Sequence, residues 1–204
     1  MKDIAIDFNS TPSIEKGIED IKDYLKSHAL VIGNSNYVIT EFEFYIMTSE
    51  NGVHYDRYTY KDERHLTKGK LFLHASGLDI TFGNESTHAG VLLRGAIKLS
   101  SIDTPTEAAI EKYINGPINV ADELVHQIDI ENGTTIGFKP VNLENISFLD
   151  ACGVRVGLKK GKYADHKNFI DKNLRYLRSL SPETMLHIDP DKKIKIRKIV
   201  QGEK

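Results

Sequence analysis

The strongest structural signal in the chain is a segment with the two-residue period of a β-strand, YVITEFEFYI at residues 37–46. Successive side chains of a strand point to opposite faces of its sheet. One face is therefore predicted to carry Val38, Thr40, Phe42, Phe44 and Ile46, and the other face Tyr37, Ile39, Glu41, Glu43 and Tyr45. The second face is unusual because it combines two carboxyl groups with large apolar side chains.

Glu41 and Glu43 lie about 7 Å apart on the predicted strand, because residues two apart share a face. Two carboxylates at this distance raise each other's pKa when water is excluded from that face. A solvent-exposed face, where glutamates are common, is the other interpretation. Tyr37 and Ile39 on the same predicted face argue partly against it.

The other periodic segments predict an α+β fold. Ile14, Ile18, Ile21 and Leu25 recur at helical spacing after Thr11, the predicted N-cap. Further strands are predicted at 71–73, 78–82, 90–97, 154–158 and 174–178, and further helices over 104–115 and 118–128. Residues 50–69 have no clear period and predict a long functional loop, and residues 132–133, Asn-Gly, predict a hairpin turn. Antiparallel strands with a few helices outside them are typical of this class.

Length and composition predict a single domain in a reducing compartment. The 204 residues contain no internal repeat or linker, so residues 1–190 are interpreted as one domain and 191–204 as a basic C-terminal tail. The lone Cys152 cannot form an internal disulfide. The N-terminus lacks an apolar signal core, and no segment approaches the roughly 20 apolar residues of a membrane span. We therefore expect a cytoplasmic protein with no membrane partner.

Charge is distributed unevenly along the chain. Residues 1–150 contain 13 Lys and Arg against 23 Asp and Glu, whereas residues 151–204 contain 14 against 6. A basic segment on an acidic protein is either a solvated surface or a phosphate-contacting face. For the second case we expect Arg155, Lys159 and Lys160 to contact phosphate.

Arg94 lies in a mostly apolar run, GVLLRGAI at residues 90–97, that is typical of a central strand. A buried arginine requires a carboxylate or an anionic ligand as its partner. Arg94 is therefore predicted to pair with a strand carboxylate or with a substrate phosphate, unless the alternation points its side chain outward.

No cofactor or metal is predicted. His54, His65 and His74 could join Asp56 or Asp79 in a metal site, but these residues do not follow a recognised ligand spacing. The chain also lacks a glycine-rich phosphate loop.

Several short motifs occur in the same order as in the methylpurine-DNA glycosylases, also called alkyladenine or 3-methyladenine DNA glycosylases. Residues 38–45, VITEFEFY, with His54 after them, resemble the active-site strand and loop of that family. Further similar segments are GKLFLH at 69–74, VLLRGA at 91–96, Gly116-Pro117, Asn132-Gly133, VRVG at 154–157, KNLRY at 172–176 and Ser181-Pro182. Together they span roughly residues 20–182. The resemblance implies a single domain with a curved, mainly antiparallel sheet and flanking helices.

The resemblance also implies site residues. Glu43 matches the family's general base, which activates a water to attack C1′ of the deoxyribose and displace the damaged base. Arg94 matches the cation that orients this water and the neighbouring phosphate. Tyr45, His54 and His74 match groups that stack on and bond to the flipped base.

The sequence departs from the family pattern at two places that handle the duplex. Ser76 stands where the family has a tyrosine that enters the base stack, and a serine cannot fill a vacated stack. The loop after His54 reads Tyr55-Asp56-Arg57-Tyr58, where the family has a serine and a basic, glycine-containing stretch.

The expected function is hydrolysis of the N-glycosidic bond of an alkylated or modified purine such as 3-methyladenine, as in base excision repair. The partner would be damaged DNA or a modified nucleoside, and the chemistry requires no cofactor. A non-catalytic module of the same fold that binds a nucleotide or nucleic acid is the alternative. A metal-dependent hydrolase using His54 and His65 is a third class.

Overall fold

The structure is a computed structural model that describes residues 6–49, 52–158 and 167–180. These residues form one nine-stranded sheet in which every strand pairing is antiparallel. The strands are β1 (His28–Ile32), β2 (Ser35–Met47), β3 (Lys68–His74), β4 (Gly77–Phe82), β5 (His88–Leu99), β6 (Ile110–Asn115), β7 (Ile136–Pro140), β8 (Leu149–Gly153) and β9 (Arg175–Ser179). The helices are α1 (Thr11–Ser27), α2 (Pro117–Val125) and the short α3 (Lys167–Ile170). Two 3₁₀ turns are η1 (Glu63–Leu66) and η2 (Glu107–Ala109).

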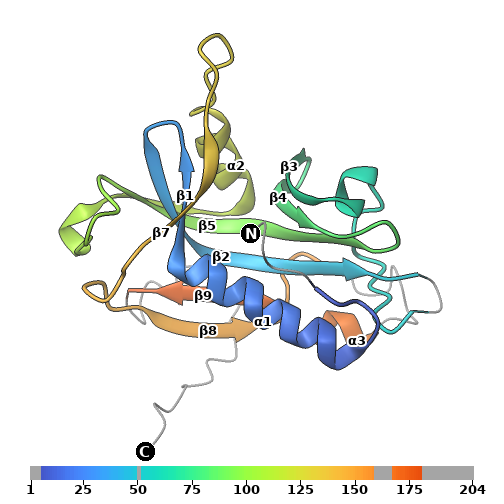
Figure 1. The fold of residues 1–204 in the computed structure, drawn as a ribbon. Helices are drawn as coiled ribbons and strands as arrows, with labels where there is room; N and C mark the ends of the chain where they lie inside the picture. The colour runs from blue at the N-terminus through green and yellow to red at the C-terminus, as the bar shows by residue number, and fades with distance from the viewer. Residues whose placement is uncertain (1–5, 50–51, 159–166, 181–204) are drawn as a thin grey trace, which may run out of the picture.

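The long strands β2 and β5 run side by side through the centre of the molecule (Figure 1). The sheet order is β3-β4-β5-β2-β1-β7, with β6 added to β5 and β9 added to β2, followed by β8. Because β2 and β5 each pair with different strands at their two ends, the sheet branches and curls. The α+β class, the antiparallel sheet and its curvature are confirmed, and the described residues are consistent with one domain.

Helix α1 begins one residue earlier than the sequence predicts. Ser10 is the N-cap, and its hydroxyl accepts the Ser13 N–H at 3.2 Å. Thr11, the predicted cap, is instead the first helical residue. An N-cap must keep extended backbone angles, and Ser10 has them, with φ −145° and ψ 153°. Ile14 and Leu25 on the inner face of the helix are fully buried.

A β-bulge near the middle of β2 changes which residues share a face. The register with β5 shifts on both sides of Glu41, between Ile39 and Phe42. The two shifts cancel, because they leave one residue unpaired in each strand, Thr40 in β2 and Arg94 in β5, and the side chains that follow point to the opposite face of the sheet. Tyr37 and Ile39 therefore lie in the main core together with Phe42, so the prediction that they share a face with Glu41 was wrong.

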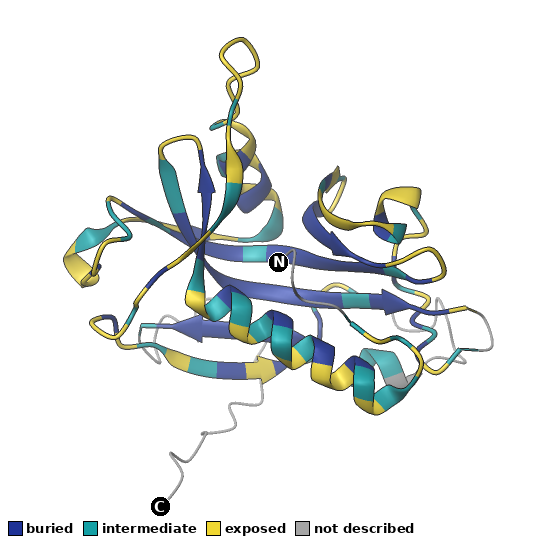
Figure 2. Ribbon diagram, viewed as in Figure 1, coloured by how far each residue is buried: buried dark blue, intermediate teal, exposed yellow. Residues whose placement is uncertain are grey.

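The bulge leaves β2 with different neighbours on its two faces. One face of β2 packs into a large core that includes residues of α1, α2, β4 and β5. On the other face, Val38 joins a smaller apolar cluster with Ile97 and Ile146. Further along that face come Glu41, Glu43 and Tyr45. Figure 2 shows β2 and β5 as almost continuously buried, so these acidic side chains lie within the protein.

Three predicted elements differ from the structure. The helix predicted over 104–115 is the turn η2 followed by strand β6, because residues 110–115 pair with the edge of β5. The strand predicted at 154–158 lies earlier, as β8. Asn132-Gly133 lies in the connection between α2 and β7 and not in a hairpin between two strands. The helix predicted over 118–128 is confirmed as α2.

No helix among the described residues is long and apolar enough to cross a membrane. The predicted basic tail, residues 191–204, lies outside the described residues.

Candidate active site

Glu41 forms the centre of a buried ion-pair cluster. Its Oε1 atom lies 2.8 Å from Arg94 Nε on β5 and 2.7 Å from Arg175 Nε on β9. The side chains of Glu41 and Arg175 are 3% and 2% exposed. Two guanidinium groups thus compensate one buried carboxylate, which ties β2 to both neighbouring strands.

Glu43 lies two residues further along the same face and has different partners. Its Oε1 atom accepts the Val156 N–H at 2.8 Å and lies 3.4 Å from Arg94 Nε, and its Oε2 atom accepts the Tyr45 hydroxyl at 2.8 Å. The residue is fully buried. The prediction that Arg94 pairs with a strand carboxylate is confirmed, and this arginine contacts both Glu41 and Glu43.

Burial raises the pKa of Glu43 above its usual range, against the opposing effects of Arg94, the Val156 amide and the Tyr45 hydroxyl. Burial and the adjacent Glu43 raise the pKa of Tyr45 well above its ordinary value. A general base must accept a proton readily, and the raised pKa gives Glu43 this property. The adjacent Tyr45 hydroxyl stays neutral and can donate to it.

A cavity of about 560 Å³ lies beside these residues. Arg94, Tyr45 and Val156, which are all direct contacts of Glu43, line it. Glu43 itself does not line the cavity and lies directly behind these three residues. The carboxylate is therefore connected to the cavity through its hydrogen-bond partners.

The cavity combines aromatic rings with positive charge. The rings of Tyr45, Tyr58, Tyr60 and His74 line it, and so do the cationic side chains of Arg57, Lys61 and Arg94. Aromatic rings bind planar ligands by stacking, and cationic groups bind phosphate. The lining is therefore suited to a ligand with a flat ring and an anionic group.

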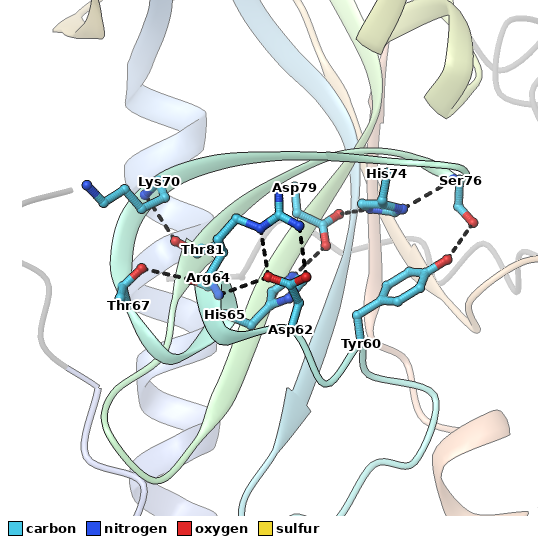
Figure 3. Close-up of polar contacts among 10 residues, drawn as sticks. All are labelled: Tyr60, Asp62, Arg64, His65, Thr67, Lys70, His74, Ser76, Asp79 and Thr81. Atoms are coloured by element: carbon cyan, nitrogen blue, oxygen red, sulfur yellow. Dashed lines mark hydrogen bonds and ion pairs between the residues drawn. The ribbon is translucent and has the colours of Figure 1, made fainter.

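His74 is part of a network of polar contacts and hydrogen bonds beside the cavity, between residues of η1, β3, β4 and the β3–β4 turn (Figure 3). Asp79 on β4 lies between two histidines: its Oδ2 atom is 2.9 Å from His65 Nε2, and its Oδ1 atom is 3.0 Å from His74 Nε2. Ser76 N–H donates to His74 Nδ1 at 3.2 Å. Burial alone would raise the pKa of Asp79, but the bonds from His65 and His74 outweigh it and lower that pKa, so Asp79 is ionised.

The structure does not bring His54 to the cavity. Its ring is buried and packs on Phe169 with a centroid distance of 4.8 Å. Burial, reinforced by Lys172 and Arg155, lowers the pKa of His54 to about 3, so the ring is neutral. The base-contacting role predicted for this position has no structural support, and the aromatic residues of the 57–61 loop line the cavity instead.

Arg155 is a structural residue in the interior. Its guanidinium forms an ion pair with Asp56 Oδ2 at 2.5 Å, with both side chains fully buried, and donates to the Phe44 carbonyl oxygen at 3.1 Å. The charge pattern predicted that Arg155 contacts phosphate. The structure does not support this prediction, because the buried guanidinium already has Asp56 as its partner. Lys159 and Lys160 lie outside the described residues.

Among the described residues, no group of three or more His, Cys, Asp or Glu side chains is arranged to hold a metal ion. The two histidines of the network share one carboxylate, and His54 lies apart from them.

The cavity residues that come from the 57–61 loop were not predicted from the sequence. Arg57, Tyr58, Tyr60 and Lys61 all line the cavity, but no period in residues 50–69 marks them. The available signal was compositional, because three tyrosines and several cations in an irregular segment are unusual for a loop without a binding role.

A scan against protein-family models finds no family that matches this chain, and a search of the curated proteins finds no match either.

Proposed function

We propose that the protein hydrolyses the N-glycosidic bond of a modified purine, with Glu43 as the general base. The observation that carries this proposal is Glu43: it is buried, its pKa is raised, and it contacts three groups that line a cavity of about 560 Å³. The order of motifs that resemble methylpurine-DNA glycosylases supports the same residue.

In the proposed reaction, a water oxygen bonds to C1′ of the sugar while the bond from C1′ to the purine nitrogen breaks. The electron pair of the broken bond leaves with the base, and an alkylated, cationic base departs as a neutral molecule. The water's proton passes to the Tyr45 hydroxyl as the phenolic proton passes to Glu43 Oε2, along the existing 2.8 Å hydrogen bond. Arg94, which lines the cavity, orients the water and stabilises the carboxylate before proton transfer.

The test is base release by the Glu43→Gln variant from an oligonucleotide that contains 7-methylguanine and from free 7-methylguanosine. We expect release to fall about 100-fold or more, because a positioned general base contributes on that scale. Tyr45→Phe should also reduce release, since it removes the proton path. Glu85→Gln, on the exposed β4–β5 turn, is the matched control. Unchanged release by Glu43→Gln, in a variant with a native circular dichroism spectrum, would overturn the assignment.

A binding module without catalysis is the second candidate, and the complete burial of Glu43 favours it. In that case wild-type protein would bind 7-methylguanosine monophosphate but release no base. Binding would weaken with salt and with Arg57→Gln or Lys61→Gln, and would not respond to Glu43→Gln.

A further inference from the structure

A continuous set of polar contacts connects the protein interior with one wall of the cavity (Figure 3). It begins at His65, which is 1% exposed, and passes through Asp79 to His74, the backbone amide and hydroxyl of Ser76, and finally the Tyr60 hydroxyl. Tyr60 and His74 line the cavity, and their ring centroids are 4.6 Å apart. The network therefore ends at two neighbouring rings of the candidate site.

The contacts determine which nitrogen of His74 carries the proton. Because Ser76 N–H donates to Nδ1, this nitrogen must present its lone pair. Neutral His74 then carries its hydrogen on Nε2, the atom that lies 3.0 Å from Asp79 Oδ1. Both ring nitrogens thus face protein groups, and Tyr60 and Phe72 pack against the ring, so a ligand contacts His74 through the part of the ring that lines the cavity.

His65 holds the Asp79 carboxylate in place. A carboxylate only accepts, so the hydrogen bond at 2.9 Å requires a hydrogen on His65 Nε2. His65 Nδ1 is buried and has no hydrogen-bond partner among the described residues. The bond to Asp79 is therefore the hydrogen bond that orients the His65 ring among the described residues.

The other end of the network connects the loop to the sheet. The Tyr60 hydroxyl lies 3.1 Å from Ser76 Oγ, so the 57–61 loop is joined to the β3–β4 turn. Ser76, which replaces the family's duplex-entering tyrosine, therefore has a role in this chain as the link between Tyr60 and His74.

We propose that Asp79 is a positioning residue that fixes the Tyr60–His74 wall as a stacking surface for a planar heteroaromatic ring. Because the rings of Tyr60 and His74 are inclined at 51°, the ligand ring stacks on one of them and meets the other at an angle, and it makes no hydrogen bond to His74. This inference deepens the proposed function, on which it rests only for the identity of the ring as a purine.

The test is a double-mutant cycle on Asp79 and His74, with binding of 7-methylguanosine measured by titration calorimetry. In Asp79→Asn, the amide cannot accept from both histidines, so one ring must turn or change tautomer. We expect about tenfold weaker binding, which corresponds to the loss of one positioned contact. In a His74→Ala background the same substitution should change affinity less than twofold, because Asp79 acts through His74.

Two controls separate positioning from general destabilisation. Asp56→Asn removes another buried carboxylate, outside the cavity lining, and should leave the affinity unchanged at a temperature where the variant is folded. The ¹⁵N shifts of His74 should show Nε2 protonated in the wild type and altered in Asp79→Asn.

Three results would overturn the proposal: wild-type affinity in Asp79→Asn, an equal loss of affinity in the His74→Ala background, or His74 protonated on Nδ1 in the wild type. Failure of the proposed function has a different result. The wild type would then release no base, while its affinity for the ring would still respond to Asp79→Asn.

Discussion

Three buried carboxylates lie on the site face of the sheet, and their partners give them different properties. Glu41 contacts two arginines, Asp79 two histidines, and Glu43 two neutral donors and one more distant guanidinium. Burial raises the pKa of Glu43 because its partners do not outweigh it, whereas the contacts from two histidines outweigh burial at Asp79 and lower the pKa of that carboxyl. The surroundings of Glu43, as well as the order of motifs, therefore support the proposal that it is the base.

The raised pKa of Glu43 predicts an unusual pH dependence of stability. The folded state binds this proton more tightly than the unfolded state, so Glu43 lowers the free energy of unfolding as pH rises from about 4.5 through the folded pKa. The difference in unfolding free energy between Glu43→Gln and the wild type should therefore shift in favour of the variant over that range. The shift is about 1.4 kcal/mol for each unit by which burial raises the pKa.

Urea denaturation of both proteins between pH 4 and pH 7 measures this difference. A difference that is constant with pH, or that moves toward the wild type as pH rises, would contradict the raised pKa.

The interior position of Arg155 predicts a strong effect of its partner. Asp56→Asn leaves the guanidinium buried without a counter-charge and should lower the free energy of unfolding by about 3 kcal/mol or more. Asp20→Asn breaks the exposed pair with Lys16 and should cost less than about 1 kcal/mol. Equal effects of the two substitutions in urea denaturation would show that Arg155 is not held in the interior.

At the scale of single residues, the sequence predicted what its local pattern determines. The need of a buried arginine for a carboxylate predicted the contact between Arg94 and the strand glutamates. The position of His54 could not be predicted, because it depends on Phe169 and Arg155, which are distant in sequence. The Asp79 network was missed for the same reason, since tertiary packing joins η1 to β4.

At the scale of elements, the strands with apolar runs could be predicted from the sequence, whereas strands at the edge of the sheet could not. Strands β3, β4 and β5 carry clear apolar runs, and their existence was predicted correctly. Residues 104–115 carry a helix-start signal at Thr104 and Glu107, but pairing with β5 overrides that local preference. Edge strands such as β6 gain their structure from a neighbour, so their own sequence contains little of the signal.

The close approach of β5 to η1 predicts an intolerant glycine. A Cβ at Gly90 would lie 2.8 Å from the ring of His65 and 3.2 Å from Asp79 Oδ2. Because His65 is buried and cannot move freely, Gly90→Ala should lower the free energy of unfolding by about 1–3 kcal/mol.

Gly137 on β7 is the matched control, because a Cβ there meets no atom within 4 Å among the described residues. Gly137→Ala should be close to neutral in the same urea experiment. A Gly90→Ala protein as stable as Gly137→Ala would mean that His65 does not pack against β5 as described.

At the scale of the whole molecule, the net charge of −2 and the small residues at the β3–β4 turn argue against duplex binding. Ala75 and Ser76 are exposed but too short to replace a base that leaves the stack. If the protein acts on nucleic acid, it must meet the full unstacking free energy, a few kcal/mol, on a duplex. We therefore predict at least about tenfold tighter binding of a 7-methylguanine oligonucleotide as a single strand than as a duplex.

Fluorescence polarisation with the two forms of the same oligonucleotide tests this preference. Ser76→Tyr should narrow the difference by supplying a side chain that can enter the stack. Ser86→Tyr, on a different exposed turn, should not. Tighter binding of the duplex by the wild type would refute this reasoning.

The bulge in β2 makes the site depend on the number of residues in the strand as well as on their identity. Upstream of Glu41, odd-numbered side chains enter the main core, whereas downstream the even-numbered ones do. Removing one residue, such as Thr40, would leave the composition of the strand almost unchanged. It would nevertheless move each downstream side chain to the opposite face of the sheet. Glu43 would then point into the hydrocarbon core and Phe44 toward the arginines. A chain that lacked Thr40 would therefore lose either part of this core or its buried acid, even if every other residue were the same.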